Sequence, residues 1–322
     1  MQFDNASTKI TRRKILQGTG SLAGGLALSH LLPGGLLAAP MDGVEQARHR
    51  FEKVPIETAK LSDSLTLLTG PGGNVVVLNG TDGKLLVDTF TQGAWDRFKK
   101  ALDDISNAPL KLAIDSHWHW DHTDNNVNVR AAGANLLAHE NTLKRLSETH
   151  DLDLIDMHCV PYAENALPQR TFKESYQTHF SGEHVSLGKF APAHPDTDLY
   201  IHFQKANVLH LGDVFFNGIY CYIDKGTNGS IHGMIAGATK MLAMIDKDTK
   251  VVPGHGPLGN KADLKKFRDM LVVAEARVRK LKTAGKSLDE AVAAKPFADL
   301  DGEWGKGFLK GDGFTHVVYT TL

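Results

Sequence analysis

The chain has 322 residues, and its 42% hydrophobic content is enough for one large buried core, so no second domain is required. The formal net charge is −1, and residues 1–40 carry four basic residues against one acidic residue (+3), which leaves −4 for residues 41–322. No stripe of lysine and arginine stands out in that larger part, so we expect no nucleic acid among the partners.

The first 40 residues differ in composition from the rest of the chain. Arg12 and Arg13 lie in Thr-Arg-Arg-Lys-Ile-Leu, which resembles a twin-arginine export motif, and a weakly apolar, glycine-rich stretch, 18–32, follows. Glycine and serine interrupt this stretch too often for a stable membrane span, and Ala38 and Ala39 are small residues suited to cleavage. We predict a twin-arginine-type signal peptide, 1–40, and a single mature domain, 41–322, that is periplasmic or secreted. The alternative is an uncleaved N-terminus.

Beyond residue 60, strand-like and helix-like segments alternate. Apolar runs between glycine-rich turns predict strands at 65–68, 74–78, 84–87, 111–114, 136–138, 178–180, 184–187, 199–203, 206–211 and 251–252. Helical periodicity predicts helices at 94–105, 124–132, 141–148, 231–245, 261–284 and 287–294. Residues 149–170 are predicted to be irregular, and 301–322 to be a poorly defined element whose aromatic side chains pack on an outer sheet face. Two similar halves of this kind indicate an α/β fold with two packed sheets and helices outside.

The segment His117-Trp118-His119-Trp120-Asp121-His122 places four possible metal ligands within six positions, directly after the strand-like run 111–114. Residues two apart on an extended backbone point the same way, so His117 and His119 can bind one ion. Asp121 and His122 follow where the chain turns into a helix, and they can bind a second ion nearby. Imidazole and carboxylate suit a borderline divalent cation such as zinc. The pattern therefore predicts a metal site rather than a chance cluster.

Three further candidate ligands follow later in the chain. His194 lies in a turn-rich segment before the strand-like run 199–203, Asp213 closes the apolar run 208–212, and His255 lies in a glycine-rich turn after 251–252. Each residue alone is more often structural than functional. Together, and in this order near strand ends, they form a convergent set with the first four.

With the motifs His-Trp-His-Trp-Asp-His, Ala-His-Pro-Asp-Thr-Asp, Leu-His-Leu-Gly-Asp and Val-Val-Pro-Gly-His-Gly, the chain resembles the metallo-β-lactamase superfamily of metallohydrolases. The resemblance runs over most of the predicted mature chain and implies a four-layer αββα sandwich. It also implies two bound metals, the first held by His117, His119 and His194, the second by Asp121, His122 and His255, with Asp213 bridging them. Asp88, after the strand-like run 84–87, is implied to orient the metal loop, and its alternative role is that of an ordinary turn residue.

The implied activity is that of a binuclear metal-dependent hydrolase. A hydroxide that bridges two divalent ions is nucleophilic at neutral pH, and one ion can polarise a substrate carbonyl. Asp121 is the expected catalytic residue, which orients the hydroxide and relays a proton to the leaving group. The expected substrate is a small molecule with an ester, lactone or amide bond, and β-lactams are among the candidates. Zinc is the expected metal, with iron or manganese as alternatives.

The aspartate at position 213 indicates which members of the superfamily the chain resembles most. Cysteine occupies this position in some lactamases, whereas glyoxalase II, lactonases and arylsulfatases share the aspartate. The separate helical substrate domain of glyoxalase II is not evident here, which weakens a thioester as the substrate. Tyr220 and Tyr222 follow Asp213 closely enough to reach the pocket, although buried packing is the more frequent role of a tyrosine.

Other functions remain open at this stage. The same fold could serve as an accessory or redox metalloprotein, such as a di-iron protein or a maturation factor. It could also bind metal without catalysis, although the complete ligand set argues against this. Cys159 and Cys221 are far apart in the sequence, which leaves both a disulfide and two separate thiols open.

Overall fold

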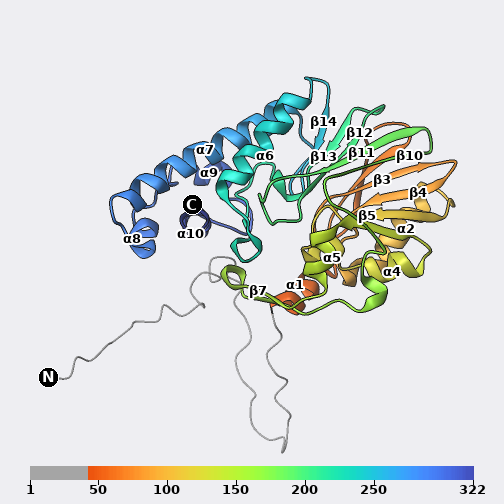
Figure 1. The fold of residues 1–322 in the computed structure, drawn as a ribbon, viewed down its shortest axis with the longest axis horizontal. Helices are drawn as coiled ribbons and strands as arrows, with labels where there is room; N and C mark the ends of the chain where they lie inside the picture. Colours follow the sequence, from red (N-terminus) through yellow and green to blue (C-terminus); the bar gives the residue numbers. More distant parts are fainter. Residues whose placement is uncertain (1–42) are drawn as a thin grey trace, which may run out of the picture.

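The computed structural model describes residues 43–322, so the predicted signal peptide lies outside the described residues. Two β-sheets pack face to face, and helices cover both outer faces (Figure 1). The structure therefore confirms the predicted αββα sandwich.

The first sheet has the strand order β1-β2-β3-β4-β5-β6-β9. Strands β1 to β4 form an antiparallel meander, and β5, β6 and β9 add to it in parallel. Parallel neighbours need crossover connections, and helices α2, α4 and α5 lie in those connections. The strands are β1 (Glu57–Lys60), β2 (Leu65–Thr69), β3 (Val75–Gly80), β4 (Gly83–Val87), β5 (Leu110–Ile114), β6 (Asn135–His139) and β9 (Arg170–Phe172).

The second sheet has the order β10-β11-β12-β13-β14. It is antiparallel except between β13 and β14, which run parallel because α6 connects them. Its strands are β10 (Ser175–Phe180), β11 (Glu183–Lys189), β12 (Leu199–Phe203), β13 (Val208–His210) and β14 (Lys250–Val252). A separate hairpin is formed by β7 (His150–Leu152) and β8 (Met157–Cys159).

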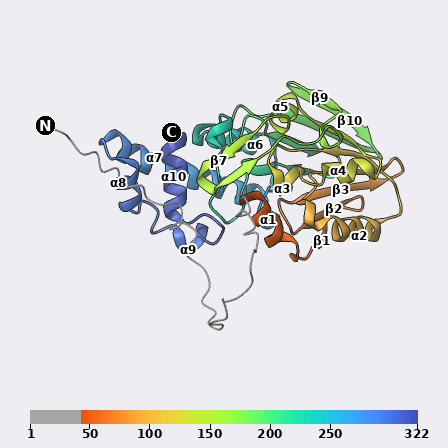
Figure 2. The ribbon, with the colours of Figure 1, turned by 90° about the horizontal axis from the view of Figure 1, so that it is seen from below.

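The helices divide between the two outer faces and one end of the molecule. The α-helices of the described residues are α1 (Gly43–Phe51), α2 (Trp95–Ile105), α3 (Trp120–Thr123), α4 (Asn126–Ala131), α5 (Glu140–Leu146), α6 (Ile231–Met244), α7 (Lys261–Thr283), α8 (Leu288–Ala293), α9 (Asp301–Trp304) and α10 (Gly311–Thr321). Side chains of α2 and α4 pack on the first sheet, and those of α6, α7 and α10 belong to the core on the second. Figures 1 and 2 both show α8, α9 and α10 gathered at the end away from β10.

The core between the sheets follows from strand alternation. In β12, Leu199, Ile201 and Phe203 are buried, whereas the two residues between them are only half-buried. The buried ones pack with Leu78 of β3 and Val87 of β4 in one apolar cluster that joins both sheets. Every second residue of a strand faces the same way, so the sequence pattern alone places these side chains inside.

The structure differs from the sequence prediction mainly where the apolar signal is weak. Helix α1 buries only Val44 and Ala47, and strand β1 is exposed along its whole length, so neither shows a clear periodicity. Residues 149–170, predicted to be irregular, contain the β7–β8 hairpin and the start of β9. The predicted helix 124–132 begins earlier and is interrupted, as α3 and α4.

The C-terminal segment 301–322 is also more ordered than predicted. It forms α9 and α10, although glycines at the start of α10 lower its intrinsic helix propensity. Phe314, Val317 and Val318 are spaced as i, i+3 and i+4, and all three are buried. Trp304 and Phe314 pack as predicted in the core of the second sheet, whereas Phe308 is exposed.

No helix among residues 43–322 is both long and apolar enough to cross a bilayer. Cys159 and Cys221 are both buried and form no disulfide bond.

The inter-sheet core gives a first testable expectation. Leu78 is fully buried between the sheets, so Leu78→Ala should lower the free energy of unfolding by about 2–5 kcal/mol. Urea denaturation followed by circular dichroism measures the change. Lys60→Ala, on the exposed strand β1, is the control and should stay within about 0.5 kcal/mol of the wild type. Equal effects of the two substitutions would contradict this placement of the core.

Candidate metal centre

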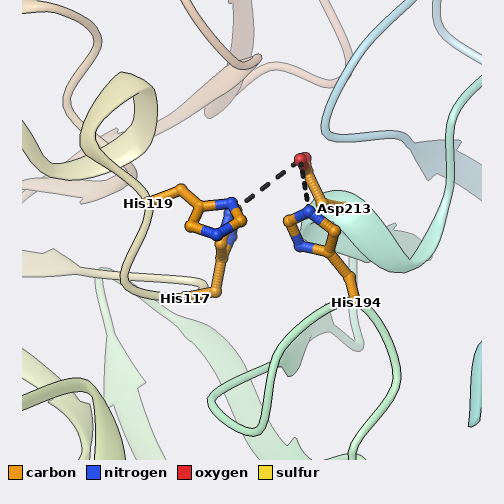
Figure 3. A group of neighbouring side chains, drawn as sticks. All are labelled: His117, His119, His194 and Asp213. Carbon is orange, nitrogen blue, oxygen red and sulfur yellow. Dashed lines mark ion pairs between the residues drawn. The ribbon is translucent and has the colours of Figure 1, made fainter. Parts of the chain in front are cut away.

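The candidate ligands lie on segments that follow or precede strands at one edge of the sandwich. His117 and His119 are in the extended loop after β5, and Asp121 and His122 are in the short helix α3 that follows. His194 lies in the loop between β11 and β12. Two more follow the parallel strands β13 and β14: Asp213, in the short 3-10 turn Gly212–Val214, and His255. Figure 3 shows His117, His119, His194 and Asp213 turned toward one another.

The seven side chains form two neighbouring groups. The first cluster consists of His117, His119, His194 and Asp213, and the second of Asp121, His122 and His255. Within each cluster the possible ligand atoms lie within 4.8 Å of one another. The structure thus brings together all the residues that the resemblance implied as ligands.

Asp213 adjoins both clusters. Its Oδ2 lies 3.6 Å from Nε2 of His194, 3.9 Å from Nε2 of His117 and 3.5 Å from Nε2 of His255. Its Oδ1 lies 3.2 Å from Nε2 of His122. One buried carboxylate therefore faces four imidazoles, which suits the bridging position.

The spacing and the bonding of these atoms fit divalent cations. Tetrahedral zinc with ligands at 2.0–2.2 Å sets neighbouring ligand atoms about 3.4 Å apart. The observed separations match this: His122 Nε2 to His255 Nε2 is 3.4 Å, and His255 Nε2 to Asp121 Oδ2 is 3.2 Å. Nε2 of His117 and both ring nitrogens of His194 are buried without a hydrogen bond. Buried polar atoms are normally satisfied, so these nitrogens are suited to an ion.

Hydrogen bonds on the far side of the rings fix how they point. Asp88 accepts bonds from Ser116 N (2.7 Å) and Ser116 Oγ (2.8 Å), and its Oδ2 lies 2.7 Å from Nδ1 of His122. Ser116 Oγ in turn lies 3.1 Å from Nδ1 of His117. Protons on these two Nδ1 atoms leave Nε2 of both rings facing the clusters. Asp88 thus has the orienting position that the resemblance implied.

Asp224 is a partner that the sequence analysis did not identify. Its Oδ2 lies 3.2 Å from Nε2 of His119, which leaves Nδ1 of that ring for a ligand. Asp224 is buried, caps the turn Lys225–Thr227 and accepts bonds from both the backbone and the hydroxyl of Thr227. Its sequence context has no ligand-like spacing, so only the fold reveals the contact.

Burial and the carboxylates divide the histidines into two kinds. Burial, with the neighbouring His122 adding to it, lowers the pKa of His117, and burial lowers the pKa of His194 to about 3. Burial acts in the same direction on His122 and His255, but Asp213 and Asp121 outweigh it, raising the pKa of His122 and bringing that of His255 to about 9. The first pair is neutral and ready to bind, and protons on the second pair must leave when cations arrive.

The centre reaches solvent through the second cluster. The side chain of Asp121 is 18% exposed and that of His255 is 24% exposed, whereas the side chains of the other five are at most 6% exposed. A small molecule would therefore meet Asp121 and His255 first.

The aromatic residues near the ligands in the sequence differ in their distance from the ligand rings. The ring of Tyr222 lies 6.0 Å from those of His119 and His194, whereas the hydroxyl of Tyr220 donates to Asp301. Trp118 and Trp120 are buried in an apolar cluster with α1 and the β7–β8 hairpin.

Two glycines are required beside the ligands. A Cβ at Gly73 would overlap the imidazole of His122, and a Cβ at Gly254 would overlap Oδ1 of Asp213. Any side chain at either position would displace a ligand.

Asp224 provides a test of ring orientation. Asp224→Ala removes the acceptor from His119, and loss of such a partner typically weakens metal binding about 10–100-fold. Competition against a chromophoric chelator measures the affinity. Asp299→Ala, which removes an exposed carboxylate paired with Arg277, is the control and should leave the affinity unchanged. An unchanged affinity for Asp224→Ala would limit this residue to capping its turn.

Comparisons with known proteins address the family and the fold. A profile described as the metallo-beta-lactamase superfamily matches residues 68–255. Among solved structures, a metallo-beta-lactamase from Pontibacter korlensis has 16% identity and a TM-score of 0.56, with 67% of this chain and 99% of that chain covered. The DIM-1 metallo-beta-lactamase has 18% identity and a TM-score of 0.56, with 69% and 100% covered. The inverting sec-alkylsulfatase Pisa1 from Pseudomonas sp. has 15% identity and a TM-score of 0.59, with 86% and 51% covered, so this chain spans about half of it. No curated protein gives a significant match.

Proposed function

The chain belongs to the metallo-β-lactamase superfamily, and from this premise we propose that it is a binuclear metal-dependent hydrolase of small-molecule esters, lactones or amides. β-Lactams are among the candidate substrates. Zinc is the proposed metal, with iron or manganese as alternatives, because the ligand set is borderline.

The observation that carries the proposal is the shared carboxylate of Asp213 between two clusters, of which only the second faces solvent. A purely structural metal site is closed, whereas a catalytic site keeps a position for water or substrate. The exposure of Asp121 and His255 provides that position.

Two cations held by these clusters would lower the pKa of a water shared between them and polarise a substrate carbonyl. The protein supplies orientation and proton transfer. Asp121 Oδ2 lies 3.2 Å from Nε2 of His255 and 3.8 Å from Nε2 of His122, so the carboxylate is held at the open side. From there Asp121 accepts a proton from the attacking water and returns it to the leaving group. Buried Asp88 and Asp224 keep the rings in place meanwhile.

The ion pairs of the ligand side chains show which charged groups surround the centre. Every ion pair made by the seven ligand side chains joins a histidine to an aspartate. Cations held by the two clusters would supply the electrophilic help to a substrate. Structural similarity covers both lactamases and an alkylsulfatase, so alkyl sulfates belong in the substrate panel beside lactams, lactones and aryl esters.

Two alternatives are kept as outcomes of the test. An accessory or redox protein of this fold would hold iron and change its absorbance on oxidation. A non-catalytic metal-binding protein would retain its metal tightly and hydrolyse none of the substrates.

Metal content and activity test the proposal together. Purified protein should contain about two transition-metal ions per chain and hydrolyse at least one substrate class. Because Asp121 also belongs to the second cluster, Asp121→Asn is assayed with excess metal, and its kcat should still fall by about 10²–10⁴-fold, since the proton acceptor is lost. Chelation should abolish activity, and zinc should restore it.

The matched control is Asp151→Asn. Asp151 also pairs with a histidine, at 2.6 Å from Nδ1 of His158, but this pair is exposed on the β7–β8 hairpin. Its activity should equal that of the wild type. Protein with less than about one ion per chain and no activity on the panel would refute the hydrolase.

We also propose that the protein is exported to the periplasm through the twin-arginine motif. Replacing Arg12 and Arg13 by lysine keeps the charge but removes the paired arginines, so full-length precursor should accumulate in the cytosol. Cell fractionation and N-terminal sequencing measure this, with Lys9→Arg as the control. Normal export of the doubly substituted protein would contradict the proposal.

A further inference from the structure

Three arginine–aspartate pairs in the described part of the chain share one geometry. In each, two guanidinium nitrogens contact the two oxygens of one carboxylate: Arg48 with Asp124, Arg145 with Asp196 and Arg277 with Asp299. This two-point contact fixes direction as well as distance, which a lysine cannot do. Asp124 of the first pair lies two residues after His122, and Asp196 of the second lies two residues after His194. Arg277 of the third pair is on helix α7, which carries no ligand.

Arg48 connects helix α1 to the second cluster. Its Nε and Nη2 lie 2.9 and 2.5 Å from the two carboxylate oxygens of Asp124, although the residues are 76 positions apart. The side chain of Asp124 is only 3% exposed. A buried carboxylate is costly without a partner, so Asp124 depends on this contact.

Asp124 lies immediately beyond the ligands Asp121 and His122. Its backbone N–H donates to the carbonyl of Trp120, which closes helix α3, and its Oδ2 accepts from the backbone of Gln92 at 2.8 Å. The neighbouring Asn125 donates to two carbonyls of the loop after β4, which also carries Asp88. Asp124 therefore ties α3 to the loop that orients His122.

Helix α1 holds Arg48 in place. Val44 and Ala47 of α1 pack in one apolar cluster with Trp118 and Trp120, which alternate with the ligands in the segment 117–122. The ring centroids of Phe51 and Trp120 lie 6.1 Å apart. The helix therefore covers the side of the metal loop that faces away from the ligands.

Arg145 forms the corresponding contact behind the first cluster. From helix α5, its Nε and Nη2 lie 3.2 and 2.5 Å from the carboxylate of Asp196, which is two residues beyond the ligand His194. Asn141 of the same helix donates to the carbonyl of Asp196, and Asn228 donates to its carboxylate. Helix α5 thus contacts the His194 loop through Asp196, while neither ring nitrogen of His194 makes a hydrogen bond.

We propose that Arg48 and Arg145 are positioning residues that act separately, Arg48 through Asp124 on the second metal position and Arg145 through Asp196 on the first. The proposal rests on the two-cation centre of the proposed function. It adds that each cation has its own supporting clamp on a different helix. The two metal affinities can then be changed one at a time by residues that touch no ligand.

The experiment uses the purified full chain and its variants Arg48→Met, Arg145→Met and Arg277→Met, each stripped of metal by a chelator before the titration. Cobalt is titrated into metal-free protein, and absorbance together with chelator competition resolves the two binding steps. Arg48→Met should weaken the step assigned to the second cluster about 10–100-fold, and Arg145→Met should weaken the other step by a similar factor. The His255→Ala and His194→Ala variants assign each step to its cluster.

Arg277→Met is the matched control, because its pair is also a two-point contact, made by the two Nη atoms, but it is exposed and contacts no ligand loop. It should change neither step. Equal weakening of both steps by Arg48→Met and Arg145→Met would show general destabilisation and overturn the proposal. No weakening in either variant would overturn it as well.

Conservative and paired variants guard against simple misfolding. Arg48→Lys keeps the charge but loses the fork, so an intermediate affinity is expected. Adding Asp124→Asn to Arg48→Met removes the unpaired buried charge and should recover part of the lost affinity. A double variant that binds more weakly than Arg48→Met would contradict the role of Asp124. A single binding step in the wild type would contradict the two-cation function itself. Two steps in the wild type that both variants weaken equally would contradict only the separate roles of Arg48 and Arg145.

Discussion

The convergence of four imidazoles on one buried carboxylate is the constraint on which the centre depends. Asp213 is almost completely buried, and its two oxygens lie 3.2 to 3.9 Å from histidines that come from three different loops. Burying so much polar surface is unfavourable unless the groups satisfy one another or bind a cation. The arrangement is therefore organised around positive charge, which protons or metal ions can supply.

The sandwich makes this convergence possible at little conformational cost. The loops after β5, β13 and β14 leave the two sheets at a common edge, so rigid strands deliver Asp121, Asp213 and His255 from distant parts of the sequence. Around the ligands lies a second set of contacts, in which Asp88, Ser116 and Asp224 choose the ring nitrogen that faces inward. Behind these lie the arginine clamps on α1 and α5. The candidate ligands are thus surrounded first by hydrogen bonds that orient their rings and then by helices that hold the loops.

The sequence predicted the parts of the molecule that have a strong local signal. Strand β12 alternates between buried and half-buried residues, and β3 begins with four apolar residues, so both could be predicted. The candidate ligands could be predicted because they lie in short motifs near strand ends. Helix α1 could not, because only two of its residues are buried and its role is carried by one arginine whose partner is 76 positions away. Asp224 is similar, since its contact with His119 depends on how a whole loop folds back. Helix α10 was missed because tertiary packing of Phe314 overrides the weak propensity of its glycines.

The glycines at positions 73 and 254 have a consequence for engineering. The imidazole of His122 lies where a Cβ at Gly73 would be, and the carboxylate of Asp213 lies where a Cβ at Gly254 would be. The centre therefore has no space for one additional carbon atom at either position. Substitutions made to alter what the centre binds gain nothing at these two sites, because every replacement there displaces His122 or Asp213. Diversity is better placed on the open rim around Asp121 and His255, where a new side chain faces solvent and leaves the buried side chains of the two clusters in place.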